Sequence, residues 1–262
     1  MILTRYLADL ADHAHLVLSF AKRDVRARYK QTAFGIAWAI VQPFSLMVVF
    51  TLVFSKFAGV PSDGVPYPVF AYSALLFWTF FAMSVSQGTL AMAANATLVR
   101  KIYFPRETLL LAVLLSASLD LAVSSTIFAG LLAYYQIPVG LSVFWVVPVL
   151  VVQVAFTLGL ICVTSAVHVH FRDVGHGLPL LMQLWMFASP VAYPLTVVPA
   201  WLRPVYLLNP MAGIIEAYRR VILHREAPDF ESLGVGVGVA VVLLTAGYLL
   251  FKRAERTFAD VI

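Results

Sequence analysis

The chain has 262 residues, of which 61% are hydrophobic and only 12% are charged. Soluble domains carry about a quarter charged residues, so this composition excludes an ordinary soluble protein and predicts an integral membrane protein. The formal net charge of +5 does not indicate a nucleic-acid-binding protein, because the basic residues form short clusters at the ends of apolar segments.

Residues 1–30 are predicted to lie at the cytoplasmic face of the membrane. Acidic and histidine residues interrupt any signal-like apolar core, so we expect this segment to remain on the chain. Apolar residues recur at helical spacing between Ile2 and Leu18, which predicts an amphipathic helix at the interface. A basic cluster follows, formed by Lys22, Arg23, Arg26, Arg28 and Lys30, and it indicates a cytoplasmic amino terminus and contact with anionic lipid.

Long segments with few charged residues predict six membrane-spanning helices. Their expected ranges are 31–55, a helix within 64–99, 108–135, 141–169, a helix running from 177 to about 190, and 232–251. Lys and Arg are more numerous on the side that holds both termini, which favours cytoplasmic termini. The expected fold is therefore an all-α integral membrane protein, with an interfacial segment over 1–30 and a six-span domain over 31–262.

A basic segment at 95–107 separates the second and third expected spans. Arg100, Lys101 and Arg106 indicate that it is cytoplasmic. Apolar residues recur at helical spacing, and Pro105 either ends the turn or begins the next helix. We expect a short amphipathic helix over 98–104, lying beneath the membrane with one face free to contact a cytoplasmic partner.

The region 190–225 contains more prolines than a simple spanning helix tolerates, and it remains apolar and aromatic. This indicates a broken or re-entrant path near the outer leaflet. A helix is expected to resume after Asn209-Pro210, with Glu216 and Arg220 forming an i, i+4 pair. The helix either closes a loop at the interface or forms a gate over an exit path, and the number of prolines favours the gate.

Asp120 is the only acidic residue well inside an expected span. Because an ionisable group at that depth is costly, it predicts a functional group with a partner elsewhere in the chain. The alternative is that neighbouring serines satisfy Asp120 within a packed interface. These serines are Ser116, Ser118, Ser124 and Ser125.

Other motifs favour structural roles. Gly234 and Gly238 predict close helix packing within the last span. The histidines at 168, 170 and 176 predict no metal site, because residues i and i+2 point to opposite sides of a helix. The single cysteine, Cys162, excludes a disulfide framework and a cysteine-based metal site.

The sequence holds no G-x-x-x-x-G-K-[ST] motif, so any ATP chemistry requires a partner protein. No Ser/His/Asp or Cys/His arrangement can be placed on one side of the membrane, which argues against an enzyme. The abundant aromatic residues fit interfacial belts, and a channel lined by some of them would suit a glycan.

Several motifs resemble the ABC-2 type permeases that export polysaccharides such as O-antigen, capsule and teichoic acid. The matching residues are Arg23-Asp24, Arg28-Tyr29, Phe34-Gly35, Trp38 and Pro43; Asn95, Leu98, Lys101, Phe104-Pro105 and Glu107; Arg172-Asp173; Ser189-Pro190, Tyr193-Pro194, Asn209-Pro210 and Arg219. Their order and spacing run along nearly the whole chain.

The resemblance implies a homodimer of permeases with two nucleotide-binding ATPase subunits, which would hold ATP and Mg²⁺, while this chain binds no cofactor. It implies a polyprenyl-diphosphate-linked glycan as substrate, most directly O-antigen, and a bacterial inner (cytoplasmic) membrane location. The segment after the second span would be a coupling helix docked on the ATPase, with Arg106 and Glu107 transmitting its movement into the third span.

The resemblance also implies residue roles. The coupling contacts would be Leu98, Arg100, Lys101, Tyr103, Phe104, Pro105, Arg106 and Glu107. The lipid headgroup would meet Arg23, Arg26, Arg28 and Lys30. The gate would comprise Pro190, Tyr193, Pro194, Asn209, Pro210, Glu216, Arg219 and Arg220.

Other functions stay open at this point. The chain could export teichoic acid, capsule, or a small lipid or drug. It could instead be a membrane-embedded transferase acting on a lipid-linked sugar, although only the isolated acids Asp120 and Glu216 are available for it. A noncatalytic membrane scaffold is the third class.

Overall fold

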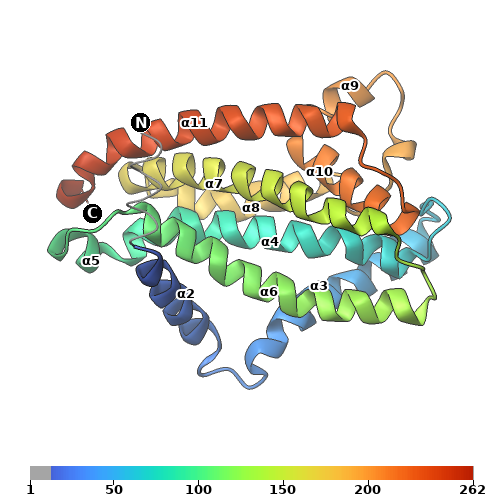
Figure 1. Cartoon of the computed structure of the whole chain (residues 1–262), viewed down its shortest axis with the longest axis horizontal. Coiled ribbons are helices and arrows are strands. Elements are labelled where there is room, and N and C mark those ends of the chain that lie inside the picture. Colours follow the sequence, from blue (N-terminus) through green and yellow to red (C-terminus); the bar gives the residue numbers. More distant parts are fainter. Residues whose placement is uncertain (1–12, 262) are drawn as a thin grey trace.

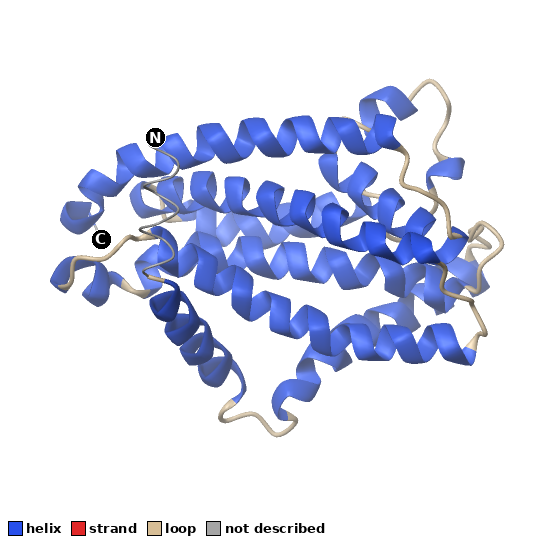
Figure 2. Cartoon of the chain, in the orientation of Figure 1, coloured by secondary structure: helices blue, strands red, loops and turns tan. Residues whose placement is uncertain are grey.

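A computed structural model describes residues 13–261, and side chains up to residue 258. Over these residues the chain consists of helices and connecting loops and has no strand, which confirms the expected all-α class (Figure 2). The part of the predicted interfacial helix that precedes residue 13 lies outside the described residues.

The helices follow one another along the chain with short connections (Figure 1). In order they are α2 (Ala14–Tyr29), the short η1 (Gly35–Ala37), α3 (Trp38–Phe50) continued by the π-helical η2 (Thr51–Phe57), α4 (Tyr67–Ala94), α5 (Ala96–Lys101), α6 (Glu107–Tyr134), η3 (Leu141–Trp145), α7 (Val146–His170), α8 (Asp173–Phe187), η4 (Leu195–Val197), α9 (Arg203–Tyr206), α10 (Pro210–Arg219), the π-helical η5 (Arg220–His224) and α11 (Phe230–Val261).

Five helical segments among the described residues are long and apolar enough to cross a membrane. They are Gly35–Phe57, Tyr67–Ala94, Glu107–Tyr134, Leu141–His170 and Phe230–Phe258. They coincide with five of the six predicted spans. At a rise of about 1.5 Å per residue, each exceeds the ~30 Å thickness of the hydrocarbon core. The chain is therefore a multi-pass membrane protein.

The remaining predicted span corresponds to α8, which has only 15 residues. A helix of this length is about 22 Å long, shorter than the hydrocarbon core. It ends at Phe187, three residues before Pro190, and the chain then continues through the short elements η4 and α9 to α10. The proline-rich region thus interrupts regular helix, as its composition predicts.

The long helices form a bundle around α4, the most buried of the five candidate spans. Helix α4 packs against α6 and α7, and α11 lies along α7 on the far side (Figure 1). Helix α5 and the carboxyl-terminal end of α11 lie at one end of the bundle, whereas α9 lies at the other. Helix α2 runs oblique to the bundle and packs against α6.

Two glycines allow α7 and α11 to touch backbone to backbone. A Cβ atom at Gly247 would lie 2.5 Å from the Gly159 carbonyl oxygen, and one at Gly159 would lie 2.6 Å from the backbone nitrogen of Leu244. Gly234 and Gly238 do not make the predicted close packing within residues 13–261, because a Cβ placed at either residue meets no neighbouring helix there within 4 Å. Small residues do bring helices together here, but nine residues beyond Gly238 along α11.

Candidate functional site

The segment between α4 and α6 has one turn and a half of helix and then an extended stretch. Helix α5 covers Ala96–Lys101, and Ile102 has extended backbone angles of φ −129° and ψ 132°. The predicted helix over 98–104 is therefore wrong at its end. Phe104 precedes Pro105, and the proline ring disfavours helical backbone angles for the residue before it.

This segment, residues 96–107, turns two kinds of side chain in opposite directions. Val99 and Phe104 are buried, and Leu98 is half-buried against the core. Ile102 is 57% exposed and Tyr103 is fully exposed. The neighbouring Arg100 and Lys101 are exposed as well. An exposed aromatic and aliphatic pair beside Arg100 and Lys101 forms a compact tip that is suited to a protein partner.

The buried side of the segment contacts both ends of the described chain. The Phe104 ring lies 5.8 Å from that of Phe20 on α2. Arg106 donates a hydrogen bond to the Glu255 carbonyl and lies over the Phe258 ring at 5.6 Å. The segment therefore contacts α2 and α11 as well as α6, which begins at its last residue.

Glu107 is buried and forms an ion pair with α11. Lys252 Nζ lies 2.9 Å from one Glu107 carboxylate oxygen and 3.0 Å from the other. Lys252 also pairs with Glu255 at 2.8 Å. Sequence reasoning placed Lys252 only in a basic tail and missed both partners. Nothing in the sequence near Lys252 indicates its contact with Glu107, because the two residues come from different helices.

A groove of about 900 Å³ lies between the segment and α11. The segment contributes residues 99–107 to it, and α11 contributes Tyr248, Lys252, Glu255 and Arg256. Arg100, Lys101 and Arg256 add positive charge to its rim, and all three are exposed. The predicted coupling residues are thus brought together at one end of the bundle.

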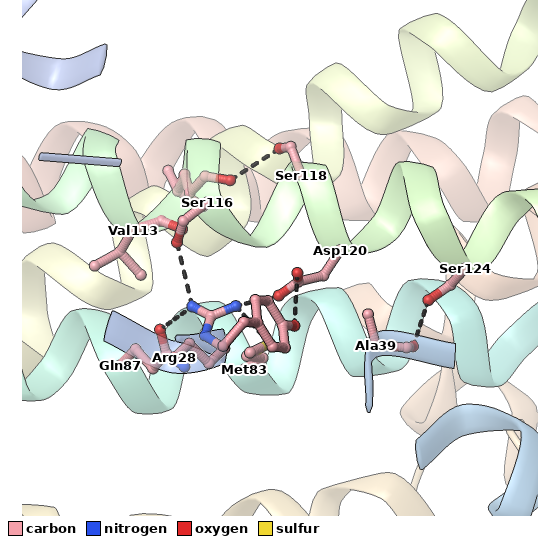
Figure 3. Close-up of polar contacts among 11 residues, drawn as sticks. Arg28, Ala39, Met83, Gln87, Val113, Ser116, Ser118, Asp120 and Ser124 are labelled. Carbon is pink, nitrogen blue, oxygen red and sulfur yellow. Dashed lines mark hydrogen bonds and ion pairs between the residues drawn. The ribbon is translucent and has the colours of Figure 1, made fainter. Parts of the chain in front are cut away.

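A second cluster joins the end of α2 to the middle of α6 (Figure 3). Arg28 forms an ion pair with Asp120, and the Tyr29 hydroxyl donates to the same carboxylate at 2.8 Å. The Arg28 guanidinium also donates to Gln87 at 2.6 Å and to Ser116 at 3.3 Å. Asp120 is therefore held by two residues of α2.

The prediction of a partner for Asp120 is confirmed, and the alternative of local serines is wrong. Ser118, Ser124 and Ser125 donate to backbone carbonyls, and Ser116 accepts from Arg28. A cavity of about 300 Å³ lies beside the ion pair, lined by aromatic and aliphatic side chains with Gln42 and Thr79.

The four basic residues predicted to meet a lipid headgroup fall into separate groups. Arg28 is committed to Asp120, and Arg23 pairs with Asp24 at 2.9 Å. Arg26 and Lys30 are exposed and line a shallow hollow with Tyr29. Of the four, only these two point to solvent without an ion pair among the described residues.

Three of the predicted gate residues, Tyr193, Asn209 and Arg219, contact the chain around the end of α8. Arg219 of α10 is 2% exposed, and its guanidinium donates to the carbonyls of Pro190 and Val191 at 2.5 and 2.9 Å. It also lies 3.6 Å from the centre of the Phe70 ring. These contacts place the guanidinium inside the protein, against backbone carbonyls and an aromatic ring.

Other side chains of this region also hydrogen-bond to the chain around the end of α8. Asn209 accepts a hydrogen bond from Trp185 at 2.9 Å and donates to Ser189 at 2.8 Å. It also caps α10, whose first residue is Pro210. Tyr193 donates to the Phe187 carbonyl at 2.8 Å. Side chains thus take the place of helical hydrogen bonds after α8 ends.

The predicted pair between Glu216 and Arg220 is wrong. Arg220 instead pairs with Glu226 at 2.8 Å. The reason is local, since Arg220 begins a π-helical turn, which changes the i, i+4 geometry. Pro194, which was also assigned to the gate, precedes the short helix η4.

Within residues 13–261, no group of three or more His, Cys, Asp or Glu side chains could hold a metal ion. Cys162 is a free, buried thiol in α7.

The comparisons with known proteins agree along the length of the chain. The family model described as ABC-2 type transporter matches residues 15–223. The chain is 33% identical to the O-antigen export system permease protein RfbA of Myxococcus xanthus, over 98% of this chain and 99% of that protein.

More distant relatives carry related names. The chain is 24% identical to the O-antigen export system permease protein RfbA of Klebsiella pneumoniae, over 94% of this chain and 95% of that protein. It is 22% identical to the polysialic acid transport protein KpsM of Escherichia coli, over 89% and 91%. The chain belongs to the ABC-2 type transporter family.

Proposed function

We propose that this chain is the membrane subunit of an ATP-driven exporter, and that it moves a polyprenyl-linked polysaccharide outward across the bacterial inner membrane. The alignments to the relatives named for O-antigen export cover nearly the whole length of this chain and of each relative. O-antigen is therefore the first choice of substrate.

The single observation that carries the proposal is the tip of the 96–107 segment. Ile102 and Tyr103 are exposed beside Arg100 and Lys101, at the end of the bundle that also holds the end of α11. The sequence has no P-loop, so ATP and Mg²⁺ bind to a partner ATPase. The tip docks in a cleft of that ATPase, and the exporter contains two copies of each subunit.

In this proposal α8 and the turns that follow it form the remaining span. Helix α8 crosses from the cytoplasmic side and ends inside the bilayer, and η4, α9 and α10 make a re-entrant path to the outer face. Arg219 satisfies carbonyls that have no water available at that depth. With six crossings, both termini are cytoplasmic, and residues 190–225 cover the exit path.

The substrate approaches beside α2. Arg26 and Lys30 are exposed there, and a lipid diphosphate needs positive charge at the interface. Arg23 is exposed nearby, although it is paired with Asp24. Arg28 acts differently in this scheme, since it fixes α2 to α6.

Co-purification with the ATPase of the same exporter tests the proposal. The double variant Arg100→Glu/Tyr103→Ala should lose at least ten-fold in ATPase recovered with the tagged chain. Tyr134→Ala is the matched control, because Tyr134 is 78% exposed at the end of α6 far from the tip. Unchanged ATPase recovery with the double variant would contradict the docking role.

Capsular polysaccharide is the second candidate substrate, because the chain also matches polysialic acid transport proteins. Expression of the chain in a strain that lacks its own capsule exporter, and separately in one that lacks its O-antigen exporter, distinguishes the two. Rescue of surface O-antigen alone supports the first substrate, and rescue of capsule alone supports the second.

A further inference from the structure

The ion pair between Glu107 and Lys252 joins two helices that pack mainly on different neighbours. Helix α11 lies mainly along α7 and α10, whereas α6 packs against α4 and α2. Glu107 is the first residue of α6, and its carboxylate is 5% exposed. The Lys252 side chain is 33% exposed. The pair therefore bridges the cytoplasmic ends of these two helices.

The pair is part of a larger network of polar contacts with α11. Lys252 holds Glu107 and Glu255 together, and Arg106 donates to the backbone carbonyl of Glu255. The Arg106 guanidinium also lies over the ring of Phe258, one turn further along. Two adjacent residues of the segment are thus attached to two successive turns of α11.

Both Glu107 and Lys252 are held in their ion pair. Breaking a buried ion pair leaves an uncompensated charge inside the protein, so separation of Glu107 from Lys252 is strongly opposed. The Lys252 stem is partly buried, which limits the reach of its ammonium group. A displacement of the segment must therefore move this end of α11 or break the pair.

We propose that Lys252 and Glu255 are positioning residues for energy coupling, which carry movement of the 96–107 segment into the last span. This inference rests on the proposed function and adds a second path to the one through α6. ATPase docking at Arg100 and Tyr103 pushes the segment, and the ion pair moves α11 with it. A pair that only stabilised the fold would not change how much substrate moves per ATP.

Charge reversal tests the proposal in inverted membrane vesicles that contain the complete exporter. The variants are Glu107→Lys, Lys252→Glu and the double reversal. The control is Arg253→Glu, because Arg253 is exposed on the same helix. The probe is the radiolabelled polyprenyl-linked glycan isolated from the native organism, and glycan transport and ATP hydrolysis are measured together.

Each single reversal should lower the ratio of glycan moved to ATP hydrolysed at least five-fold while the ATPase still co-purifies. The double reversal should recover at least half of the ratio, and Arg253→Glu should keep it. Single variants with a normal ratio, or a double variant that recovers none of it, would overturn the proposal. Loss of the ATPase from wild-type complexes would instead refute the proposed function.

A cross-link covers the case in which a reversed variant does not fold. Cysteines replace Glu107 and Lys252 in a Cys162→Ala background, and a short bismaleimide joins them in the assembled complex. If the two residues move as one body, the joined complex keeps most of its transport. Loss of transport on joining, with ATP hydrolysis preserved, would overturn the proposal.

Discussion

Arg28 at the end of α2 forms an ion pair with Asp120 in the middle of α6, two residues that lie 92 positions apart. Their side chains are only 17% and 9% exposed. An isolated acid within a long apolar helix is costly, and here an arginine from α2 compensates it. The pair therefore fixes where α2 meets the bundle.

Removal of one partner of this pair should destabilise the protein. Asp120→Asn leaves the Arg28 guanidinium without its anion, and breaking a buried pair costs about 3–5 kcal/mol. We expect a clear drop in the melting temperature of the protein purified in detergent. Arg26→Gln is the control, because Arg26 is exposed and should change the melting temperature little.

The double variant Arg28→Met/Asp120→Leu separates charge from packing. Apolar replacement of a whole buried pair is often close to neutral, so stability should return to within about 1 kcal/mol of the natural protein. Export should nevertheless be impaired, since α2 would no longer be held at a fixed angle. Full export by this variant would show that the pair serves stability alone.

Arg219 should be required for an intact connection between α8 and α10. Arg219→Met leaves the Pro190 and Val191 carbonyls buried without donors, at about 1–3 kcal/mol for each. We expect lower thermal stability and faster proteolysis after α8. Arg220→Met is the matched control, since its pair with Glu226 is at the surface and contributes about 0–1 kcal/mol. Equal effects of the two variants would contradict this role.

The contact between α7 and α11 should not tolerate a methyl group. Gly247→Ala would place a Cβ 2.5 Å from the Gly159 carbonyl oxygen and should cost about 1–3 kcal/mol as the helices separate. Gly234→Ala is the control on the same helix, where the Cβ meets nothing within 4 Å. It should be neutral or slightly stabilising, because alanine favours helix over glycine. Thermal unfolding in detergent compares them.

Arg26 of α2 and Lys30, which directly follows α2, should affect substrate binding and not stability. Arg26→Gln/Lys30→Gln should weaken binding to vesicles that contain a polyprenyl diphosphate at least three-fold relative to neutral vesicles. The melting temperature should not change, since neither side chain is buried. Unchanged binding to the diphosphate vesicles would remove these residues from substrate access.

Periodicity and charge predicted the helices well where each helix depends on its own sequence. Segments such as Tyr67–Ala94 and Glu107–Tyr134 are long and apolar enough to predict from composition alone. The length of α8 was harder, because its end depends on how Arg219 and Asn209 satisfy the chain after Phe187. The π-helical turn at Arg220 likewise has no clear signature in the sequence.

The site divided in the same way. The basic tip of the 96–107 segment and the isolated Asp120 were visible as sequence patterns, but their partners were not. Lys252 lies 145 positions from Glu107, and only tertiary packing brings the two together. The close approach at Gly247 was missed for the same reason, since the facing helix determines which glycine is needed.

We propose that this chain carries a lipid-linked polysaccharide across the inner membrane. The most direct measurement is the leaflet in which that polysaccharide lies in a strain that lacks the chain, followed by surface accessibility to a lectin. We predict accumulation on the cytoplasmic leaflet, rescue by the natural chain, and no rescue by Arg100→Glu/Tyr103→Ala. Normal appearance of the polysaccharide at the outer surface in the deleted strain would contradict the claim.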